Sequence, residues 1–234
     1  MTGRSTSTSR SPRIEVTNDP ERAATLAAEI IAGRLRSALG RRGAAALAVS
    51  GGSTPAPMLA RLATADLDWP RVTVFQVDER VAPDGHTDRN IGIVQPIIET
   101  GATVLPMPVT DPDLHRAAAQ YAELLPARID VVHLGIGDDG HTASWPPGDP
   151  VIDAPGRVAV SDVYQGRIRM TLTPSVVNAA RLRVVLVAGA SKRTALERWL
   201  AGDRSVPVHR VHRTNTIVVV DAAAAPTVSG AARG

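Results

Sequence analysis

Short apolar segments alternate with segments of helical periodicity along this chain, and the alternation constrains its fold more than any other feature. The apolar segments predict strands at residues 14–16, 44–49, 72–77, 103–105, 129–134, 182–188 and 216–220. Helices are expected between them. One covers residues 20–39, a second starts at residue 55, and a third follows the polar loop of residues 81–90 and runs to about residue 99. The others are expected over residues 112–125, 174–180 and 191–200. Strands that alternate with helices predict a doubly wound, mostly parallel α/β sheet with helices on both faces.

The first helix shows the clearest start and stop signals. Asp19 is a good N-cap and Pro20 fits the first helical position. The glycines at 40 and 43 mark its end. Later in the chain, residues 157–163 and 168–173 interrupt the alternation and are close enough to pair as a small antiparallel insertion.

The chain's organisation is expected to be simple. Residues 1–12 are Ser, Thr and Arg with almost no apolar content, which predicts a disordered tail before one domain over residues 13–234. Aromatic residues make up 3% of the chain, so aliphatic side chains must build the core. The apolar runs are too short to cross a bilayer, no signal-peptide pattern is visible, and cysteine is absent. We therefore expect a cytoplasmic protein with no membrane partner.

The charge balance argues against nucleic acid as a partner. The formal charge is +3 and arginine supplies almost all of the basic residues, since Lys192 is the only lysine. The arginines form no basic stripe, and few aromatic residues are available to stack on bases. An arginine-rich solvated surface accounts for most of them, and a cluster around a small anionic ligand accounts for the excess equally well.

The segment from Gly135 to Thr142 carries the strongest chemical signal. It follows a predicted buried strand and presents Asp139 and His141 in a glycine-rich turn, at the strand end where α/β proteins bind ligands. His141 is the best candidate for a general base, and Asp139 is placed to fix its tautomer or to share a water with it. His133, inside the apolar strand, is expected to be a core residue instead. Three other histidines, at positions 115, 209 and 212, are expected at the surface.

Two familiar kinds of catalytic site lack their sequence signals. No G-x-S-x-G is present, which argues against a nucleophile elbow. No H-x-x-x-H or comparable cluster is present, so we expect neither a metal nor another cofactor.

Three further segments contain residues that suit an anionic ligand. Gly51, Gly52, Ser53 and Thr54 lie between a strand and a helix, where free N–H groups bind phosphate, although an ordinary capped turn has the same sequence. Asp78 and Arg80 end the next strand, and His86 and Asn90 follow in a polar loop. Arg80 can clamp a phosphate or stabilise an oxyanion, and the alternative is a surface salt-bridge cluster. Arg167, Arg169 and Lys192 can reach the same edge of the sheet, although each alone is typical of a solvated charge.

Together these segments resemble the 6-phosphogluconolactonases, a family that shows S-G-G-S-T-P, D-E-R with a following His and Asn, G-x-G-x-D-G-H-T-A-S, R-x-T-L-T and G-x-x-K in this order. The chain matches them at residues 50–55, 78–80 with 86 and 90, 135–144, 169–173 and 189–192. It departs after Ser144, where Trp145-Pro146 replaces the family's Leu-Phe. We expect this departure to affect the shape of one pocket wall.

The resemblance implies a Rossmann-like fold and hydrolysis of 6-phospho-D-glucono-1,5-lactone in the pentose phosphate pathway without a metal. It implies that His141 activates water and protonates the leaving ring oxygen, that Asp139 orients the base or the water, and that Arg80, Arg169 and Lys192 divide phosphate binding and oxyanion stabilisation. The expected partner is a small phosphorylated sugar lactone, with the protein acting as a monomer or homodimer.

Two alternatives use a similar scaffold. Glucosamine-6-phosphate deaminases share a D-G-H turn, but they carry D-E-Y where this chain has Asp78-Glu79-Arg80, and F-N-E where it has Ser144-Trp145-Pro146. A non-catalytic sugar-phosphate sensor would not require the turn that carries His141. Both comparisons favour the lactonase.

Overall fold

A computed structural model describes residues 11–227 of the chain. Its main element is a seven-stranded sheet in the order β1-β10-β9-β6-β2-β3-β5, in which every neighbouring pair is parallel. The strands are β1 (Arg13–Thr17), β2 (Ala45–Val49), β3 (Val72–Gln76), β5 (Thr103–Leu105), β6 (Val131–Leu134), β9 (Arg183–Val187) and β10 (Thr216–Asp221). The strands predicted from the apolar segments are therefore confirmed.

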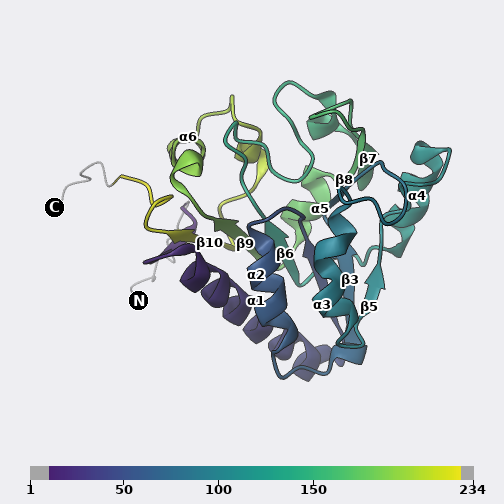
Figure 1. Ribbon diagram of the computed structural model, residues 1–234, viewed down its shortest axis with the longest axis horizontal. Helices are drawn as coiled ribbons and strands as arrows, with labels where there is room; N and C mark the ends of the chain where they lie inside the picture. Colours follow the sequence, from purple (N-terminus) through teal and green to yellow (C-terminus); the bar gives the residue numbers. More distant parts are fainter. Residues whose placement is uncertain (1–10, 228–234) are drawn as a thin grey trace, which may run out of the picture.

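Helices cover both faces of this sheet, as a doubly wound fold requires. One face packs against α1 (Pro20–Arg42), α2 (Pro55–Ala63) and α3 (Gln95–Ile98), which lie in front of the sheet in Figure 1. The other face packs against α4 (Leu114–Leu124), α5 (Pro174–Ala179) and α6 (Arg193–Ala201). In β9, Val184 and Leu186 face the first layer while Val185 and Val187 face the second, because successive side chains of a strand point to opposite faces.

The ends of α1 are those that the sequence predicts. Asp19 accepts a hydrogen bond from the backbone N–H of Arg22, and Gly43 ends the helix at φ +72°. Two other predicted helices are shorter than expected. The helix expected up to residue 99 is a 3-10 turn over Asn90–Val94 followed by α3, and the one expected from residue 191 begins with a 3-10 turn over Ala190–Lys192. Further 3-10 turns occur at Trp69–Arg71, Pro150–Asp153 and Pro207–Arg210.

The predicted antiparallel insertion is confirmed and has one more strand than expected. β7 (Val158–Val160) pairs with β8 (Arg169–Leu172), and β8 pairs on its other side with β4 (Asp78–Arg80). The segment Asp78-Glu79-Arg80 is therefore not merely the end of β3. It leaves the large sheet after Val77 and joins the small one, because Val77 N–H bonds to Val49 while its carbonyl accepts from Leu172 N–H.

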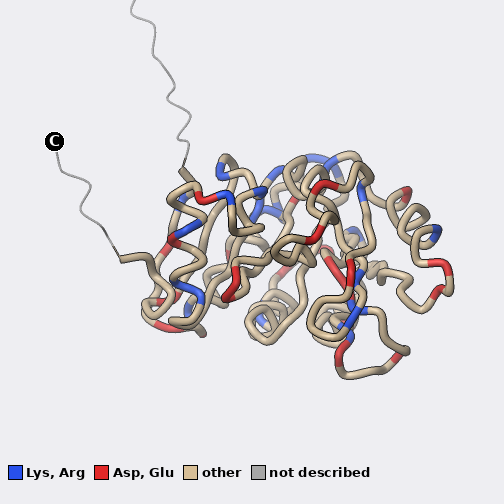
Figure 2. Tube along the Cα trace, turned by 90° about the horizontal axis from the view of Figure 1, so that it is seen from above, with Lys and Arg blue, Asp and Glu red and all other residues tan. Residues whose placement is uncertain are grey.

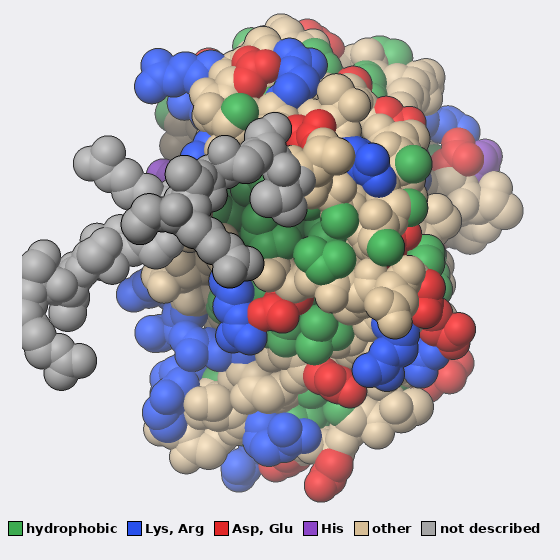
Figure 3. Space-filling view, turned by 90° about the vertical axis from the view of Figure 1, so that its left-hand side faces the viewer, with side chains coloured by type: hydrophobic (Ala, Val, Ile, Leu, Met, Phe, Trp, Pro, Cys, Tyr) green, Lys and Arg blue, Asp and Glu red, His purple; other side chains and the backbone are tan. Residues whose placement is uncertain are grey.

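Charged positions are distributed widely over the molecule. Basic and acidic residues are interspersed along the trace in Figure 2, and on the face shown in Figure 3 Lys and Arg are most frequent at the lower left, with acidic side chains among them. None of the helices in residues 11–227 is long and apolar enough to span a membrane. The predicted tail falls mainly on residues 1–10, which lie outside the described residues.

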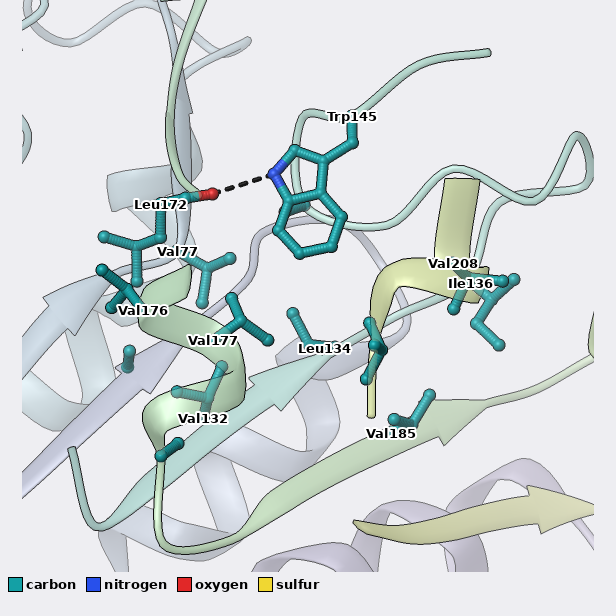
Figure 4. Close-up of a cluster of buried hydrophobic side chains, with 14 of the residues drawn as sticks. Val77, Val132, Leu134, Ile136, Trp145, Leu172, Val176, Val177, Val185 and Val208 are labelled. Atoms are coloured by element: carbon teal, nitrogen blue, oxygen red, sulfur yellow. Dashed lines mark hydrogen bonds between the residues drawn. The ribbon is translucent and has the colours of Figure 1, made fainter. Parts of the chain in front are cut away.

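Trp145 belongs to the core between the sheet and the α4–α6 layer. Its side chain is fully buried among aliphatic residues that include Val77, Leu134 and Val177 (Figure 4). Its indole Nε1 donates to the carbonyl of Leu172 at 2.8 Å, which satisfies the one polar group that the ring carries.

The strand order places two of the predicted segments side by side. From β2 the chain moves outward to β3 and β5, and then crosses back to add β6 on the other side of β2. The carboxyl ends of β2 and β6 therefore flank the point where the direction of winding reverses, which is where open α/β sheets bind ligands. Ser50, just after β2, donates from Oγ to the carbonyl of His133 in β6 at 3.2 Å.

Candidate active site

One cleft of about 200 Å³ at the carboxyl ends of these strands collects residues from all five motif segments. It is lined by residues 50–55, Asp78, Arg80, Asn90, residues 135–137 and 141–143, Arg169, residues 186–188 and Lys192. All predicted site residues are in this lining except Asp139, His86 and Arg167. Asp139 lies behind His141 and contacts its ring, so the two predicted proton-transfer residues are adjacent.

The turn after β6 requires glycine at two positions. A Cβ on Gly137 would lie 2.0 Å from Nδ1 of His141, so any larger residue would displace the imidazole. Gly140 has φ +83°, and a Cβ there would lie 2.7 Å from Cβ of Val206. The turn is closed by a hydrogen bond from Gly137 N–H to the carbonyl of His141 at 2.8 Å. The tight backbone thus sets the position of His141 at the cleft.

His141 and Asp139 form a hydrogen-bonded pair. Asp139 Oδ1 lies 2.6 Å from Nδ1 of His141 and also accepts from its backbone N–H at 3.0 Å. A proton on Nδ1 completes the first bond, which leaves Nε2 as the basic nitrogen of the neutral ring. Burial alone would raise the pKa of Asp139, but the hydrogen bonds from the His141 backbone, Tyr164 and the His141 ring hold that pKa below its ordinary value. Asp139 is therefore an anionic acceptor beside the base.

Arg169 is the most buried cation of the cleft. It is 3% exposed, and its guanidinium lies 5.0 Å from the centre of the Tyr164 ring. Burial lowers its pKa, while the nearby Asp78 carboxylate opposes that effect. Arg169 lines the cleft, and its buried Nε has no hydrogen-bond partner within residues 11–227.

Arg80 is oriented by the polar loop that follows it. Its Nη1 donates to Asn90 Oδ1 and to the carbonyl of Asp88, each at 2.9 Å. The carboxylate of Glu79 turns away into the protein, where it accepts from the backbone N–H groups of Asn90 and Ile91. Glu79 therefore shapes the loop, and Asn90 rather than a carboxylate fixes Arg80.

Asp78 connects the small sheet to the segment that follows His141. Ser144 Oγ donates to Asp78 Oδ2 at 2.7 Å, and Asn90 Nδ2 donates to the Asp78 carbonyl at 3.0 Å. Burial raises the pKa of Asp78, and the bond from Ser144 counteracts part of the effect. Asp78 thus holds three elements together as well as lining the cleft.

The segment after β2 presents the start of α2 to the cleft. A Cβ on Gly51 would lie 2.1 Å from Cγ of Asn90, so glycine here admits the loop that fixes Arg80. Gly52 has φ +105°, a backbone conformation that favours glycine because it has no Cβ. The side chain of Thr54 makes no capping hydrogen bond, but Pro55 and Pro57 have no N–H, so among the first three residues of α2 only Ala56 can offer a backbone donor to an anion.

Lys192 enters the cleft from the segment after β9. It forms an ion pair with Asp138, which also accepts from Ser191 Oγ at 3.1 Å. The hydrogen bond from Lys192 is the main cause that lowers the pKa of Asp138. The lysine is thereby held at the rim beside the turn that carries His141.

Several predicted residues lie elsewhere. His86 does not line the cleft, because its loop turns outward and its ring contacts Arg167 Nη2 at 3.3 Å. Arg167 is in turn bound to Asp88, so neither residue reaches the cleft. Trp145 lies in the core and neither it nor Pro146 lines the cleft, so the effect of this departure on a pocket wall stays a prediction. His133 is buried in β6, as predicted.

The surface prediction for the other three histidines holds in part. The structure leaves the residues at 115 and 212 exposed and the one at 209 half-buried.

Sequence reasoning missed Asp138, Tyr164 and Gln165. Tyr164 contacts both Asp139 and His141, but it stands in a polar loop between two short strands and carries no motif. Asp138 and Asp139 are adjacent, and the sequence does not show which of the two carboxylates faces the imidazole of His141. Within residues 11–227, no group of three or more His, Cys, Asp or Glu side chains is arranged to hold a metal ion.

Comparison with known proteins supports the resemblance. Residues 18–220 match the family model described as glucosamine-6-phosphate isomerases/6-phosphogluconolactonase. A 6-phosphogluconolactonase of Pseudomonas aeruginosa is 39% identical over 207 residues, which are 80% of this chain and 85% of that protein. One from Synechocystis is 36% identical over 179 residues, covering 70% of this chain and 74% of that protein.

Solved structures show the same fold. A 6-phosphogluconolactonase from Shewanella baltica superposes with a TM-score of 0.82 at 25% identity, covering 91% of this chain and 97% of that one. The Trypanosoma brucei enzyme gives 0.82 at 26% identity, covering 92% and 98%. A monomeric glucosamine-6-phosphate deaminase gives 0.78 at 18% identity, covering 91% and 98%, and this likeness is one of fold alone.

Proposed function

Because the chain belongs to the glucosamine-6-phosphate isomerase/6-phosphogluconolactonase family, we propose that it hydrolyses 6-phospho-D-glucono-1,5-lactone to 6-phospho-D-gluconate, a step of the oxidative pentose phosphate pathway. One observation carries this proposal. The cleft joins a histidine whose Nδ1 is occupied by Asp139 to three cations, Arg80, Arg169 and Lys192. The free ring nitrogen can activate water for attack on a neutral ester. The three cations can bind the phosphate group of the same ligand.

The first chemical step uses Nε2 of His141 as a general base. It takes a proton from a water molecule as the water oxygen bonds to the lactone carbonyl carbon, and the carbonyl π electrons move to oxygen to give a tetrahedral oxyanion. The imidazolium that forms is stabilised by the Asp139 carboxylate at 2.6 Å from Nδ1. Arginine guanidinium groups at the cleft stabilise the oxyanion, since both Arg80 and Arg169 are fixed before substrate arrives.

The second step returns the same proton. The oxyanion reforms the carbonyl, the bond from carbon to the ring oxygen breaks, and Nε2–H of His141 protonates that oxygen as it leaves. The product is an open-chain carboxylic acid that ionises in water, and the neutral imidazole is restored. A reference pKa near 6.5 lets an imidazole accept and donate a proton near neutral pH.

The phosphate group requires a site away from the carbonyl. We propose that Lys192 and the N–H groups around Gly52 and Ser53 bind it, because a partly exposed ammonium and backbone N–H groups before a helix both suit a dianion. Arg80 and Arg169 then remain for the reacting end of the substrate. The proposed form is a cytoplasmic monomer or homodimer that needs no cofactor or macromolecular partner.

The test is a coupled assay in which freshly generated lactone is consumed faster than its spontaneous hydrolysis. We expect His141→Gln to lower kcat by about 10² to 10⁴, the usual contribution of a general acid–base group. His115→Gln is the matched control because His115 is exposed on α4. Full activity in folded His141→Gln would refute the mechanism. Ammonia release from glucosamine 6-phosphate, without lactone hydrolysis, would favour the deaminase instead.

A further inference from the structure

The loop between β7 and β8 ends in a tight two-residue turn that fixes Tyr164. The backbone N–H of Tyr164 donates to Arg167 at 2.9 Å, and that of Arg167 donates back to Tyr164 at 3.2 Å. Gln165 and Gly166 between them have φ +49° and +77°, the left-handed pair that a tight hairpin turn of the right twist uses. Tyr164 therefore projects from an ordered backbone rather than from a loose loop.

The hydroxyl of Tyr164 completes the surroundings of the Asp139 carboxylate. It donates to Asp139 Oδ2 at 2.7 Å, while Oδ1 is engaged by His141. The same hydroxyl lies 3.2 Å from His141 Nδ1, and the two rings meet edge to face with centroids 5.4 Å apart. Both carboxylate oxygens are thus held, and the imidazole is restrained on its Nδ1 side and on one edge.

Tyr164 also connects this pair to the buried cation. Gln165 Nε2 donates to the Tyr164 hydroxyl at 3.1 Å, and Gln165 Oε1 accepts from Arg169 Nη2 at 3.0 Å. The Arg169 guanidinium lies over the Tyr164 ring. The proton-transfer pair and the arginine consequently share one support on this hairpin.

We propose that Tyr164 is a positioning residue for lactone hydrolysis: its hydroxyl fixes the Asp139 carboxylate that orients His141, and its ring supports Arg169. This inference rests on the function proposed above. Burial and the hydrogen bond to Asp139 raise the pKa of Tyr164 to about 12, so the hydroxyl remains a donor throughout the neutral range. The residue stands outside the five motif segments, and nothing in their spacing indicates it.

The kinetic test separates the hydroxyl from the ring. Tyr164→Phe removes only the hydroxyl, and we expect kcat to fall about tenfold, the rate equivalent of one hydrogen bond to a charged group, with KM unchanged. Tyr164→Leu also removes the ring under Arg169, so KM is expected to rise as well. Val163→Ala is the control, because Val163 is 67% exposed on the same loop.

A spectroscopic test reads the pair without turnover. The Nδ1 proton of His141 is expected to give a low-field proton resonance at low temperature, identified by its loss in His141→Gln. Tyr164→Phe should shift or broaden this signal, and Val163→Ala should leave it in place. Thermal unfolding of each variant establishes that the fold is retained.

The outcomes distinguish the two proposals. An active wild-type enzyme with unchanged kcat in Tyr164→Phe would overturn the role of Tyr164 alone. A loss of kcat with an unaltered His141 signal would also overturn it, because the effect would not pass through Asp139. Wild-type protein that does not accelerate lactone hydrolysis would overturn the proposed function, and the positioning role with it.

Discussion

Asn90 Oδ1 accepts a hydrogen bond from Arg80 Nη1 at 2.9 Å, so an uncharged amide sets the direction of a guanidinium that lines the cleft. The amide nitrogen of Asn90 binds the Asp78 carbonyl on the strand that carries Arg80. Asn90 is 5% exposed and packs against Gly51 at a distance that only glycine allows. The turn after β2 and Arg80 are therefore both in contact with one side chain.

Replacing Asn90 should disable Arg80 without unfolding the protein. In Asn90→Leu the side chain keeps a similar volume but loses both hydrogen bonds, and we expect kcat/KM to fall by about tenfold to a hundredfold. Steady-state kinetics in the coupled assay measures this. Gln95→Leu, at an exposed position in α3, serves as the control and should be unchanged. Normal kinetics in folded Asn90→Leu would show that Arg80 needs no anchor.

Removing the partner of Lys192 should strengthen substrate binding. Asp138→Asn abolishes the ion pair and a negative charge beside the proposed phosphate site, so we expect KM to fall about threefold, with the effect shrinking at high salt. Lys192→Gln should raise KM instead. Glu21→Gln breaks the surface ion pair with Arg61 far from the cleft and should leave KM unchanged. A higher KM in Asp138→Asn would contradict this prediction. It would mean that Asp138 holds Lys192 in position and does not compete with the substrate phosphate for it.

His133 should make the protein sensitive to acid. Burial lowers its pKa to about 3, whereas the unfolded chain titrates near 6.5, so the unfolded state binds the extra proton between these values. Stability is therefore lost as pH falls below 6.5, by about 2 kcal/mol at pH 5.

His133→Leu removes this contribution, and both ring nitrogens of His133 lack partners within residues 11–227, so no hydrogen bond is lost. Urea unfolding at pH 7 and pH 5 should show a smaller loss in His133→Leu than in the wild type. His115→Gln should behave like the wild type, and equal losses in all three proteins would contradict the assignment.

Trp145 should contribute to stability and not to substrate binding. Trp145→Phe leaves a cavity and removes one of two hydrogen bonds to the Leu172 carbonyl, so we expect a loss of about 2–3 kcal/mol with unchanged KM. Trp199 is equally buried, but its indole nitrogen has no partner in the described part of the chain, so Trp199→Phe should cost less. Chemical unfolding measures the loss in free energy of unfolding for each variant. Equal losses would show that the hydrogen bond from Trp145 to Leu172 makes no net contribution to stability.

The sequence predicted the strands and the doubly wound class because apolar periodicity and burial coincide in a parallel sheet. It did not predict that Asp78-Glu79-Arg80 forms a strand of the second sheet. Three residues are too few for a period, and their partner is β8, far along the chain. The length of the helix expected up to residue 99 was also overestimated. Here too a contact between separate segments decides the structure, because the carboxylate of Glu79 binds the N–H groups that begin the 3-10 turn at Asn90.

Most of the cleft was predictable from motifs at strand ends, because parallel strands bring their carboxyl ends to one edge. The details were not. Gln165 adopts a left-handed backbone without being glycine, so nothing in its identity marks the turn that presents Tyr164. His86 occurs at a suitable spacing, but its loop points outward, and that direction depends on Asp88 and Arg167.

Within residues 11–227, the first strand of the large sheet lies at its edge beside the last one. β1 pairs with β10 alone, and Thr17 Oγ1 donates to Val220 across 203 residues. During synthesis β1 therefore leaves the ribosome long before its partner exists, and closing so long a loop delays its pairing. Chains that end before residue 216 would lose both strands from this edge. They would also expose β9 as a new, unpaired strand open to self-association.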